Sequence, residues 1–365
     1  MAPPLLSMSS LVANRLLLWK LTRMRTRFFG NDRRRRSWPH GSRLSRAATA
    51  GASICLLLAL LVSGCVAGQR SVRAQISEIP RDDRSSITFL FMEPARQADR
   101  YPAVLYLQGS ACASVTESLP YLQPFAENGI AVIAYEARGV QPEDDGSRCS
   151  PEFLAANNRQ QRIDDAYSVL AQARKKYPSW DGRLVILGAS EGAAIAPEVA
   201  ANEAGTIGLI IMGGGGWPQS DELMLLERRR LERSGAGLEQ TEAAISELRA
   251  TFERIRAEPS SLTVWRGHSY QWWSSHLWTS PMEHLLRVGA PIFVAHGAKD
   301  EAVPVESADA IAVAFEAERK TGLTYKRYSE LGHSWKDDKG DSHIREVGRD
   351  IHEWLCSHIA DLRCP

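Results

Sequence analysis

The chain contains 365 residues, of which 44% are hydrophobic, and its formal net charge at pH 7 is +1. A chain of this length and composition can bury one large core, or a core with an insertion. The total charge hides an uneven distribution, because the first 64 residues hold 11 of the 44 basic residues and one of the 43 acidic residues. Residues 65–365 therefore carry 33 basic and 42 acidic groups, and this acidic body argues against non-specific binding of nucleic acid.

The first 64 residues have the pattern of an export signal. Four arginines over 33–36 precede an apolar run that is densest over 54–62. That run is far shorter than the roughly 20 residues that a membrane-spanning helix needs. A basic region, a short apolar core and small residues before a cleavage point are typical of a signal that is removed after export.

The end of this segment, "LVSGC" over 61–65, resembles a bacterial lipobox. The resemblance implies acylation of Cys65 and a lipid-anchored protein of the bacterial envelope that faces the periplasm. Val66 follows this cysteine instead of an aspartate, so in a Gram-negative organism we expect the outer membrane. Val62 departs from the commoner leucine, and the long basic region leaves Met24 as an alternative start. The alternatives to lipid attachment are a secreted or soluble periplasmic protein and an uncleaved anchor.

Six cysteines are present, and Cys55 lies in the signal while Cys65 would take the lipid. An even number of remaining cysteines in an exported chain favours disulfides over the alternative, buried free thiols. Among the three possible pairings we expect Cys112–Cys149 and Cys356–Cys364. The first bridge would close a loop of 38 residues, which stabilises a fold by about 4 kcal/mol on the chain-entropy model.

The body of the chain alternates strand and helix patterns. Residues 65–85 are polar and are expected to form a tether, and one domain follows over 86–365. Near-continuous apolar strands separated by helices such as 160–177 are typical of an α/β fold with a mostly parallel central sheet and helices on both faces. The expected strands are 86–91, 103–109, 131–137, 183–189, 206–214, 291–297 and 324–329.

One interval, about 218–287, contains no clear strand and predicts a helical cap insertion. Its second helical pattern places the apolar residues from Ile245 to Ile255 along one face, and four tryptophans follow within 14 residues. These aromatic residues could pack against the main body or line an apolar pocket above an active site. We expect both roles, with most of the tryptophans structural and with Tyr270 and Trp273 contacting substrate.

The stretch "LVILGASEGAAIA" carries the candidate nucleophile. Its residues 188–192 fit the pattern G-x-S-x-G, which alone is weak, since a chain this long meets it by chance about one time in ten. Here the motif follows an apolar strand and begins a helix. Ser190 would therefore lie on a strained strand-to-helix turn with backbone N–H groups beside it.

A serine hydroxyl needs a base, and the base needs an orienting acid. Asp300 follows the strand over 291–297, and His333 follows the strand over 324–329. Loops after parallel strands meet at one edge of a sheet, where sites form. The order Ser190, Asp300, His333 is the one expected for an α/β-hydrolase.

From about residue 86 onward the chain resembles an α/β-hydrolase. The resemblance rests on the serine motif, the H-G-x-x-D-x-x-V-P segment over 296–304 and the Gly-His pair at 332–333. It is nearest to dienelactone-hydrolase-like and prolyl-oligopeptidase-like enzymes, which cleave esters or peptides without cofactors. The resemblance also implies an oxyanion hole made by the backbone N–H of Glu191 and that of Ser110, with Ala111 as the alternative to Ser110.

Each assignment has a competitor. Asp300 could instead be a turn or helix-capping residue, with Asp221 as the substitute acid. His343 competes with His333 but lies among charged residues. His268 and His276, in the expected cap, are interpreted as packing residues or substrate contacts.

Two acidic features near the site remain. The Asp164-Asp165 pair is expected to form salt bridges on a helix. The Glu191 side chain would oppose anionic substrates if it faced the pocket, and we expect it to turn aside and bond elsewhere.

The sequence thus predicts a serine hydrolase that cleaves small-molecule carboxylic esters through an acyl-enzyme. The alternatives are a serine peptidase of prolyl-oligopeptidase-like type acting on short peptides, and a non-catalytic envelope lipoprotein that retains the fold. No Cys/His cluster has zinc spacing and no glycine loop for phosphate is present, so neither a metal nor a nucleotide cofactor is expected. The oligomeric state stays open.

Overall fold

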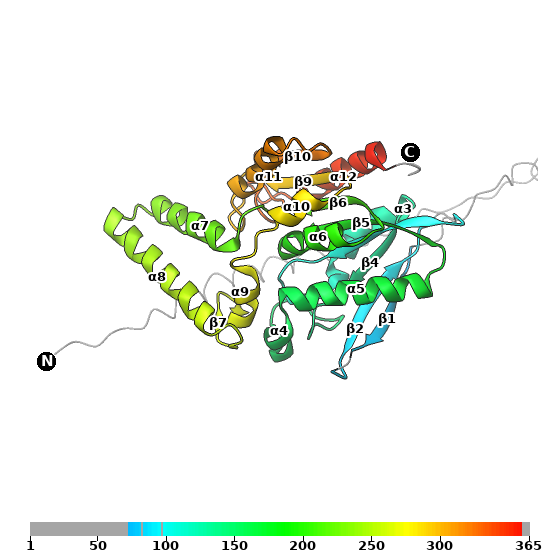
Figure 1. The fold of residues 1–365 in the computed structure, drawn as a ribbon, viewed down its shortest axis with the longest axis horizontal. Helices are drawn as coiled ribbons and strands as arrows, with labels where there is room; N and C mark the ends of the chain where they lie inside the picture. Colours follow the sequence, from blue (N-terminus) through cyan, green and yellow to red (C-terminus); the bar gives the residue numbers. More distant parts are fainter. Residues whose placement is uncertain (1–71, 82, 96–97, 360–365) are drawn as a thin grey trace, which may run out of the picture. The chain divides into compact units, whose positions relative to one another are not determined.

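The computed structural model describes residues 72–81, 83–95 and 98–359 (Figure 1). The expected signal, the lipid site Cys65 and the C-terminal Cys364 lie outside these residues. Within the described part, one eight-stranded sheet forms the centre and helices cover both of its faces. The α/β architecture predicted from the alternation of strands and helices is therefore confirmed.

The sheet is parallel except at one end. Its order in space is β1 (Ala74–Pro80), β2 (Ser86–Met92), β4 (Ala131–Tyr135), β3 (Tyr101–Leu107), β5 (Trp180–Ala189), β6 (Thr206–Met212), β9 (Ile292–Gly297) and β10 (Leu323–Tyr328). β2 pairs antiparallel with both β1 and β4, and every other pairing is parallel. The carboxyl ends of β3, β5, β6, β9 and β10 consequently lie at the same edge.

Two groups of helices bury the two faces of the sheet. The helices α5 (Arg159–Lys176), α6 (Glu191–Asn202), α10 (Met282–Arg287) and α11 (Val305–Ala317) contribute to the core on one face. The helices α3 (Leu119–Glu127) and α12 (Ile344–His358) contribute to the core on the other. Because both faces are covered, Leu105, Ile186 and Val294 of the central strands are fully buried, which explains why the strands read as continuous apolar runs.

All seven expected strands are present in the central sheet, and the sheet contains one further strand, β1, that the sequence did not predict. β1 lies within the segment 65–85 that was expected to be a tether, and it pairs with β2 from Ala74 to Pro80. β1 is an edge strand in which Ile76 is 55% exposed, so its polar composition does not carry the alternating pattern of a half-buried strand. The tether prediction is wrong for residues 74–80.

The predicted helical insertion forms a cap with its own small core. It comprises α7 (Gln219–Arg233), α8 (Leu238–Ala257), a two-stranded ribbon of β7 (Val264–Trp265) and β8 (His268–Ser269), and α9 (Tyr270–His276). Figure 1 shows α7 and α8 extending away from the sheet, whereas α9 lies against α5. The predicted end at 287 is too late, because α10 packs against α6 and belongs to the main body. None of the described helices has the length and hydropathy of a membrane span.

Candidate active site

Ser190 occupies the sharp turn between β5 and α6. Its backbone has φ 55° and ψ −118°, a conformation that costs a non-glycine residue free energy and is typical of a strained functional turn. A Cβ atom on Gly188 would lie 2.3 Å from the carbonyl oxygen of Gly192, and one on Gly192 would lie 1.9 Å from that of Leu107. Both glycines are therefore needed for the turn to close, and the turn presents the serine.

Ser190, His333 and Asp300 form a continuous chain of hydrogen-bonding contacts. Nε2 of His333 lies 2.9 Å from Oγ of Ser190, and Nδ1 of the same ring lies 2.7 Å from Oδ2 of Asp300. The three residues follow β5, β10 and β9, so the common edge of the parallel sheet brings them together across 143 residues of sequence. The sequence predicted this grouping, and the geometry agrees with it.

The Asp300 carboxylate is fully buried and held from two sides. Its second oxygen, Oδ1, accepts hydrogen bonds from the backbone N–H groups of Ala302, at 2.8 Å, and Val303, at 2.9 Å. The neighbouring His296 is also buried, and its Nε2 lies 3.1 Å from the carbonyl oxygen of Val303. Burial lowers the pKa of His296, although Asp300 nearby acts in the opposite direction.

The loop after β3 lies directly against the nucleophile. A Cβ atom on Gly109 would lie 3.2 Å from Cβ of Ser190. Ser110 and Glu191, the two expected oxyanion donors, line the same cavity as Ser190, whereas the alternative Ala111 does not. The N–H of Glu191 lies in the first turn of α6, where backbone donors have no partner within the helix.

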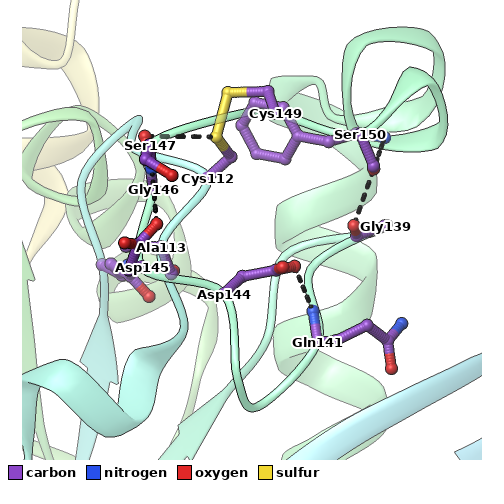
Figure 2. The surroundings of a disulfide bond; sticks show 12 residues. Cys112, Ala113, Gly139, Gln141, Asp144, Asp145, Gly146, Ser147, Cys149 and Ser150 are labelled. Carbon is purple, nitrogen blue, oxygen red and sulfur yellow. Dashed lines mark hydrogen bonds between the residues drawn. A yellow bond between two sulfur atoms is a disulfide. The ribbon is translucent and has the colours of Figure 1, made fainter.

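A disulfide ties this loop to a second loop, as the sequence predicted. Cys112 and Cys149 are bonded, with their Cα atoms 5.3 Å apart. Figure 2 shows the surrounding contacts, in which the loops also pair through Ala113 and Asp145. The N–H of Ser114 donates a further hydrogen bond of 2.7 Å to the carbonyl of Asp144. The bridge therefore begins two residues after Ser110. The second expected bridge involves Cys364 and stays a prediction.

The Glu191 side chain turns away from the nucleophile and is buried in a polar network. Its Oε1 accepts a hydrogen bond of 3.0 Å from the indole Nε1 of Trp272 and lies 2.9 Å from Nε2 of His276, both on α9. Its Oε2 lies 2.8 Å from the guanidinium of Arg162 on α5. Burial raises the pKa of this carboxyl, but Arg162 and then His276 outweigh burial and lower it to about 2. Glu191 is therefore ionised and points into the interior between α5 and α9.

A cavity of about 460 Å³ opens at Ser190 beneath the cap. Its apolar wall includes Trp217, Leu223, Trp272, Trp273 and Val303. Its polar and charged lining residues include Glu222, Glu227, Arg230 and Arg266. Trp273 thus lies where the sequence predicted a substrate contact.

The predicted contact at Tyr270 is wrong. Tyr270 is buried in the core of the cap with Phe252 and Leu248 and does not line the cavity. It begins α9, and its side chain packs toward α8 instead of toward the serine. The apolar residues predicted along one face of α8 are all buried, as expected.

The competing acid and base lie elsewhere. Asp221 is exposed on the first turn of α7, and His343 contacts Asp337 and Glu346 instead of the serine. His268 and His276 line the cavity, where His268 stacks on Trp272 with the ring centroids 4.0 Å apart.

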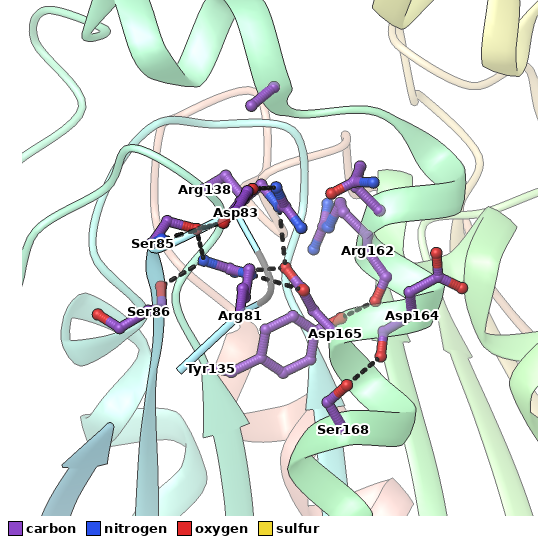
Figure 3. A network of polar contacts seen from close by, with 12 residues as sticks. Arg81, Asp83, Ser85, Ser86, Tyr135, Arg138, Arg162, Asp164, Asp165 and Ser168 are labelled. Atoms are coloured by element: carbon purple, nitrogen blue, oxygen red, sulfur yellow. Dashed lines mark hydrogen bonds and ion pairs between the residues drawn. The ribbon is translucent and has the colours of Figure 1, made fainter. Parts of the chain in front are cut away.

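Only one of the two paired aspartates on α5 forms the expected salt bridge. Asp165 is buried and lies 2.6 Å from the guanidinium of Arg81 and 3.7 Å from that of Arg138 (Figure 3). Asp164 instead accepts a hydrogen bond from Gln160 one turn earlier on the helix surface.

Arg162 is a site residue that the sequence did not predict. It is 4% exposed, and it donates hydrogen bonds of 2.6 Å and 3.3 Å to the carbonyls of Gln108 and Gly109 in the loop after β3. A signal was present, because Arg162 shares the helical face of the buried Ala166 and Val169. Over the described residues, no group of His, Cys, Asp and Glu side chains could hold a metal ion.

Comparison with solved structures supports the fold. The acylaminoacyl peptidase of Pyrococcus horikoshii is similar with a TM-score of 0.55 at 10% identity, over 84% of this chain and 44% of the peptidase. The Pyrococcus furiosus esterase Pf2001 gives a TM-score of 0.53 at 13% identity, over 80% of this chain and 92% of the esterase. Est1E from Butyrivibrio proteoclasticus gives a TM-score of 0.52 at 15% identity, over 78% of this chain and 99% of Est1E. This chain therefore spans less than half the length of the peptidase.

The family comparison is more specific than these structural likenesses. A search of curated proteins found no match to the sequence. The family model Hydrolase_4, described as serine aminopeptidase S33, matches residues 112–339, which include Ser190, Asp300 and His333. This chain belongs to that serine aminopeptidase S33 family and is an α/β-hydrolase enzyme.

Proposed function

We propose that this enzyme cleaves small carboxylic esters through an acyl-enzyme on Ser190. The observation that carries the proposal is the contact chain from Ser190 through His333 to the buried Asp300, which opens onto a cavity. In this mechanism His333 Nε2 takes the proton of Ser190 Oγ as that oxygen attacks the ester carbonyl. His333 then returns the proton to the leaving alkoxide.

The second half of the reaction reverses these roles. His333 removes a proton from a water molecule as that water attacks the acyl carbon, and then gives this proton to Ser190 Oγ as the bond to the acyl carbon breaks and the carboxylic acid leaves. The backbone N–H groups of Ser110 and Glu191 donate hydrogen bonds to the oxyanion that forms in both halves. Asp300 orients the imidazole and stabilises its protonated form.

Small esters fit the size and lining of the site. A cavity of about 460 Å³ lies within the range of small-molecule sites, and its tryptophans and leucines favour an apolar acyl or alcohol group. Two of the similar structures that share this fold are esterases.

Peptide hydrolysis is the second candidate, and the family description favours it. The matching family is named for a serine aminopeptidase, and the first of the similar structures is an acylaminoacyl peptidase. Turnover of aminoacyl p-nitroanilides separates the two, because a serine peptidase also cleaves activated p-nitrophenyl esters. We expect turnover of p-nitrophenyl acyl esters with no measurable turnover of the p-nitroanilides, whereas clear turnover of the p-nitroanilides would establish the peptidase. Turnover of neither set would favour a non-catalytic envelope protein.

We also propose that the mature protein is attached to the bacterial envelope by lipid on Cys65, with its body in the periplasm. The support is the sequence "LVSGC" over 61–65 behind a basic and apolar signal. The intact mass of the protein purified from membranes tests this. A first residue other than Cys65, or the absence of added acyl mass, would contradict lipid attachment.

A further inference from the structure

We propose that Arg162 and Glu191 are positioning residues that together hold both donors of the oxyanion hole, and that helix α9 of the cap completes their anchor. This inference rests on the proposed function, because it concerns how Ser110 and Glu191 direct their N–H groups. No part of the serine-histidine-aspartate chain involves Arg162, so the inference adds a separate requirement for catalysis.

Arg162 sets the direction of the Ser110 N–H. Its guanidinium donates a hydrogen bond of 3.3 Å to the carbonyl of Gly109, which belongs to the same peptide unit as that N–H. In a planar trans peptide the C=O and the N–H point in opposite directions. A carbonyl held toward Arg162 therefore turns the Ser110 N–H away from α5, and Gly109 itself lies against Ser190. The second bond, 2.6 Å to the carbonyl of Gln108, stops the loop from rotating about the first.

Glu191 holds the other donor through its own side chain. Its backbone N–H follows the strained Ser190, so this peptide unit would relax if nothing restrained it. The carboxylate is fixed at both oxygens, by Arg162 on one side and by Trp272 and His276 on the other. The side chains of Arg162 and Glu191 are only 5% and 3% exposed, so water cannot replace these contacts.

The chemistry of the pair explains why these residue types are present. A buried charge is tolerated only when it is paired and hydrogen-bonded. Arg162 and Glu191 pair with each other, while their hydrogen bonds go to the loop after β3 and to α9 respectively. The planar guanidinium fork of Arg162 reaches three acceptors at once, on Gln108, Gly109 and Glu191. A lysine ammonium is a single point charge and cannot reproduce that fork.

Helix α9 links the cap to the same pair. His276 and Trp272 both donate to Oε1 of Glu191, and both line the substrate cavity. When α9 packs against α5, its Trp272 and His276 therefore fix the Glu191 carboxylate and, through it, the oxyanion hole.

The test compares steady-state kinetics of Arg162→Lys and Glu191→Gln with those of a matched control, Asp165→Asn. Asp165 lies on the same helix and forms a buried ion pair, with side chains of Arg81 and Asp165 that are 7% and 5% exposed, but it does not touch the loop after β3. A misplacement of about 1 Å in an active site costs about 100-fold in rate. We expect both site variants to lower kcat per titrated active site by about 10- to 100-fold, with KM changed less than about threefold.

Two further readouts separate positioning from general loss of structure. The affinity for a trifluoromethyl ketone, which mimics the oxyanion intermediate, should fall by the same factor as kcat/KM. His276→Ala should lower kcat, and His276→Gln, which keeps a donor toward Glu191, should restore most of it. Asp165→Asn should lower the melting temperature about as much as Arg162→Lys does while leaving kcat within about twofold.

The outcomes are distinguishable. An active wild-type enzyme whose Arg162→Lys and Glu191→Gln variants keep kcat within the range of the control would overturn this inference alone. If Arg162→Lys does not fold, equal kcat values for the His276→Ala variant and the wild type would overturn it. A wild-type protein that cleaves no ester overturns the proposed function, and this inference falls with it.

Discussion

Nδ1 of His333 lies 2.7 Å from Oδ2 of Asp300, while Oδ1 of that carboxylate accepts two backbone hydrogen bonds. Because both carboxylate oxygens are engaged as acceptors, the ring must donate from Nδ1. Nε2 is then left with a free electron pair toward Ser190. This relationship fixes the tautomer that a general base requires.

Replacing Asp300 by asparagine should break this arrangement. An asparagine can turn its amide NH₂ toward Nδ1 and stabilise the opposite tautomer, in which Nε2 carries the proton. We expect kcat for p-nitrophenyl esters to fall by about 10³- to 10⁴-fold, with little change in KM. The exposed Asp221→Asn on α7 serves as the control and should keep its activity. A loss of less than tenfold in the Asp300 variant would show that another residue orients the base.

Removing the Cys112–Cys149 bridge should affect both stability and activity. The Cys112→Ser, Cys149→Ser double variant loses a cross-link over a sequence separation of 37 residues, which is worth about 4 kcal/mol on the chain-entropy model. We expect the free energy of unfolding in urea to fall by that order. We also expect kcat to fall several-fold, since the bridge begins two residues after Ser110. Dithiothreitol should reproduce the loss of kcat in the wild type and leave the kcat of the variant unchanged. A wild-type kcat that neither the substitutions nor dithiothreitol lower would contradict the link to the loop.

Glu222 should make stability fall as the pH rises. Burial on α7 raises the pKa of its carboxyl to about 8, with Asp300 adding to the shift and the hydrogen bond from Ser307 opposing it. Between the ordinary pKa of about 4.5 and that value, the folded protein holds a proton that the unfolded chain has lost, so the free energy of unfolding decreases with pH.

The variant Glu222→Gln removes this dependence while keeping an acceptor for Ser307. We expect its melting temperature to equal that of the wild type near pH 4 and to exceed it by several degrees at pH 8.5. Glu227→Gln is the contrast, because Arg230 beside Glu227 lowers the pKa of that carboxyl, so this variant should lose stability above pH 5. Melting temperatures recorded from pH 4 to pH 9 measure the two variants against the wild type. A constant difference in melting temperature between the wild type and Glu222→Gln across this range would contradict a raised pKa of Glu222.

Trp273 and Tyr270 should differ in their effect on substrate choice. Both are buried in the cap, but only Trp273 lines the cavity. Trp273→Leu removes apolar contact area from the acyl group, so the ratio of kcat/KM for p-nitrophenyl octanoate to that for the acetate should fall about tenfold. Tyr270→Leu should lower the melting temperature and leave this ratio unchanged. Equal ratios in the two variants would mean that Trp273 does not touch the acyl chain.

The central architecture could be predicted from the sequence because burial on both sides of a parallel sheet leaves continuous apolar runs. Ser190, Asp300 and His333 could be predicted because each follows such a run, and parallel strands bring their carboxyl ends to one edge. β1 could not, since an edge strand pairs through its backbone and leaves little trace in its side chains.

The residues that support the site were harder to predict. Glu191 was expected to turn aside, but its partners Arg162 and His276 are separated from it by 29 and 85 residues, and sequence periodicity describes only local neighbours. The sequence of the cap gave no indication of which rings face the cavity, because Tyr270, Trp272 and Trp273 are neighbouring aromatic residues that are all buried on α9. Tyr270 was misassigned for that reason.

Reaction with a fluorophosphonate probe is the most direct test of the central claim that Ser190 is an activated nucleophile. We predict that the native wild-type protein gains the mass of one phosphonyl group, that peptide mapping finds it on Ser190, and that Ser190→Ala gains none. Heat-denatured wild type should also remain unlabelled, since activation depends on His333 and Asp300. Labelling of Ser190→Ala at the wild-type rate, or no labelling of the folded wild type, would show that Ser190 is not the activated nucleophile.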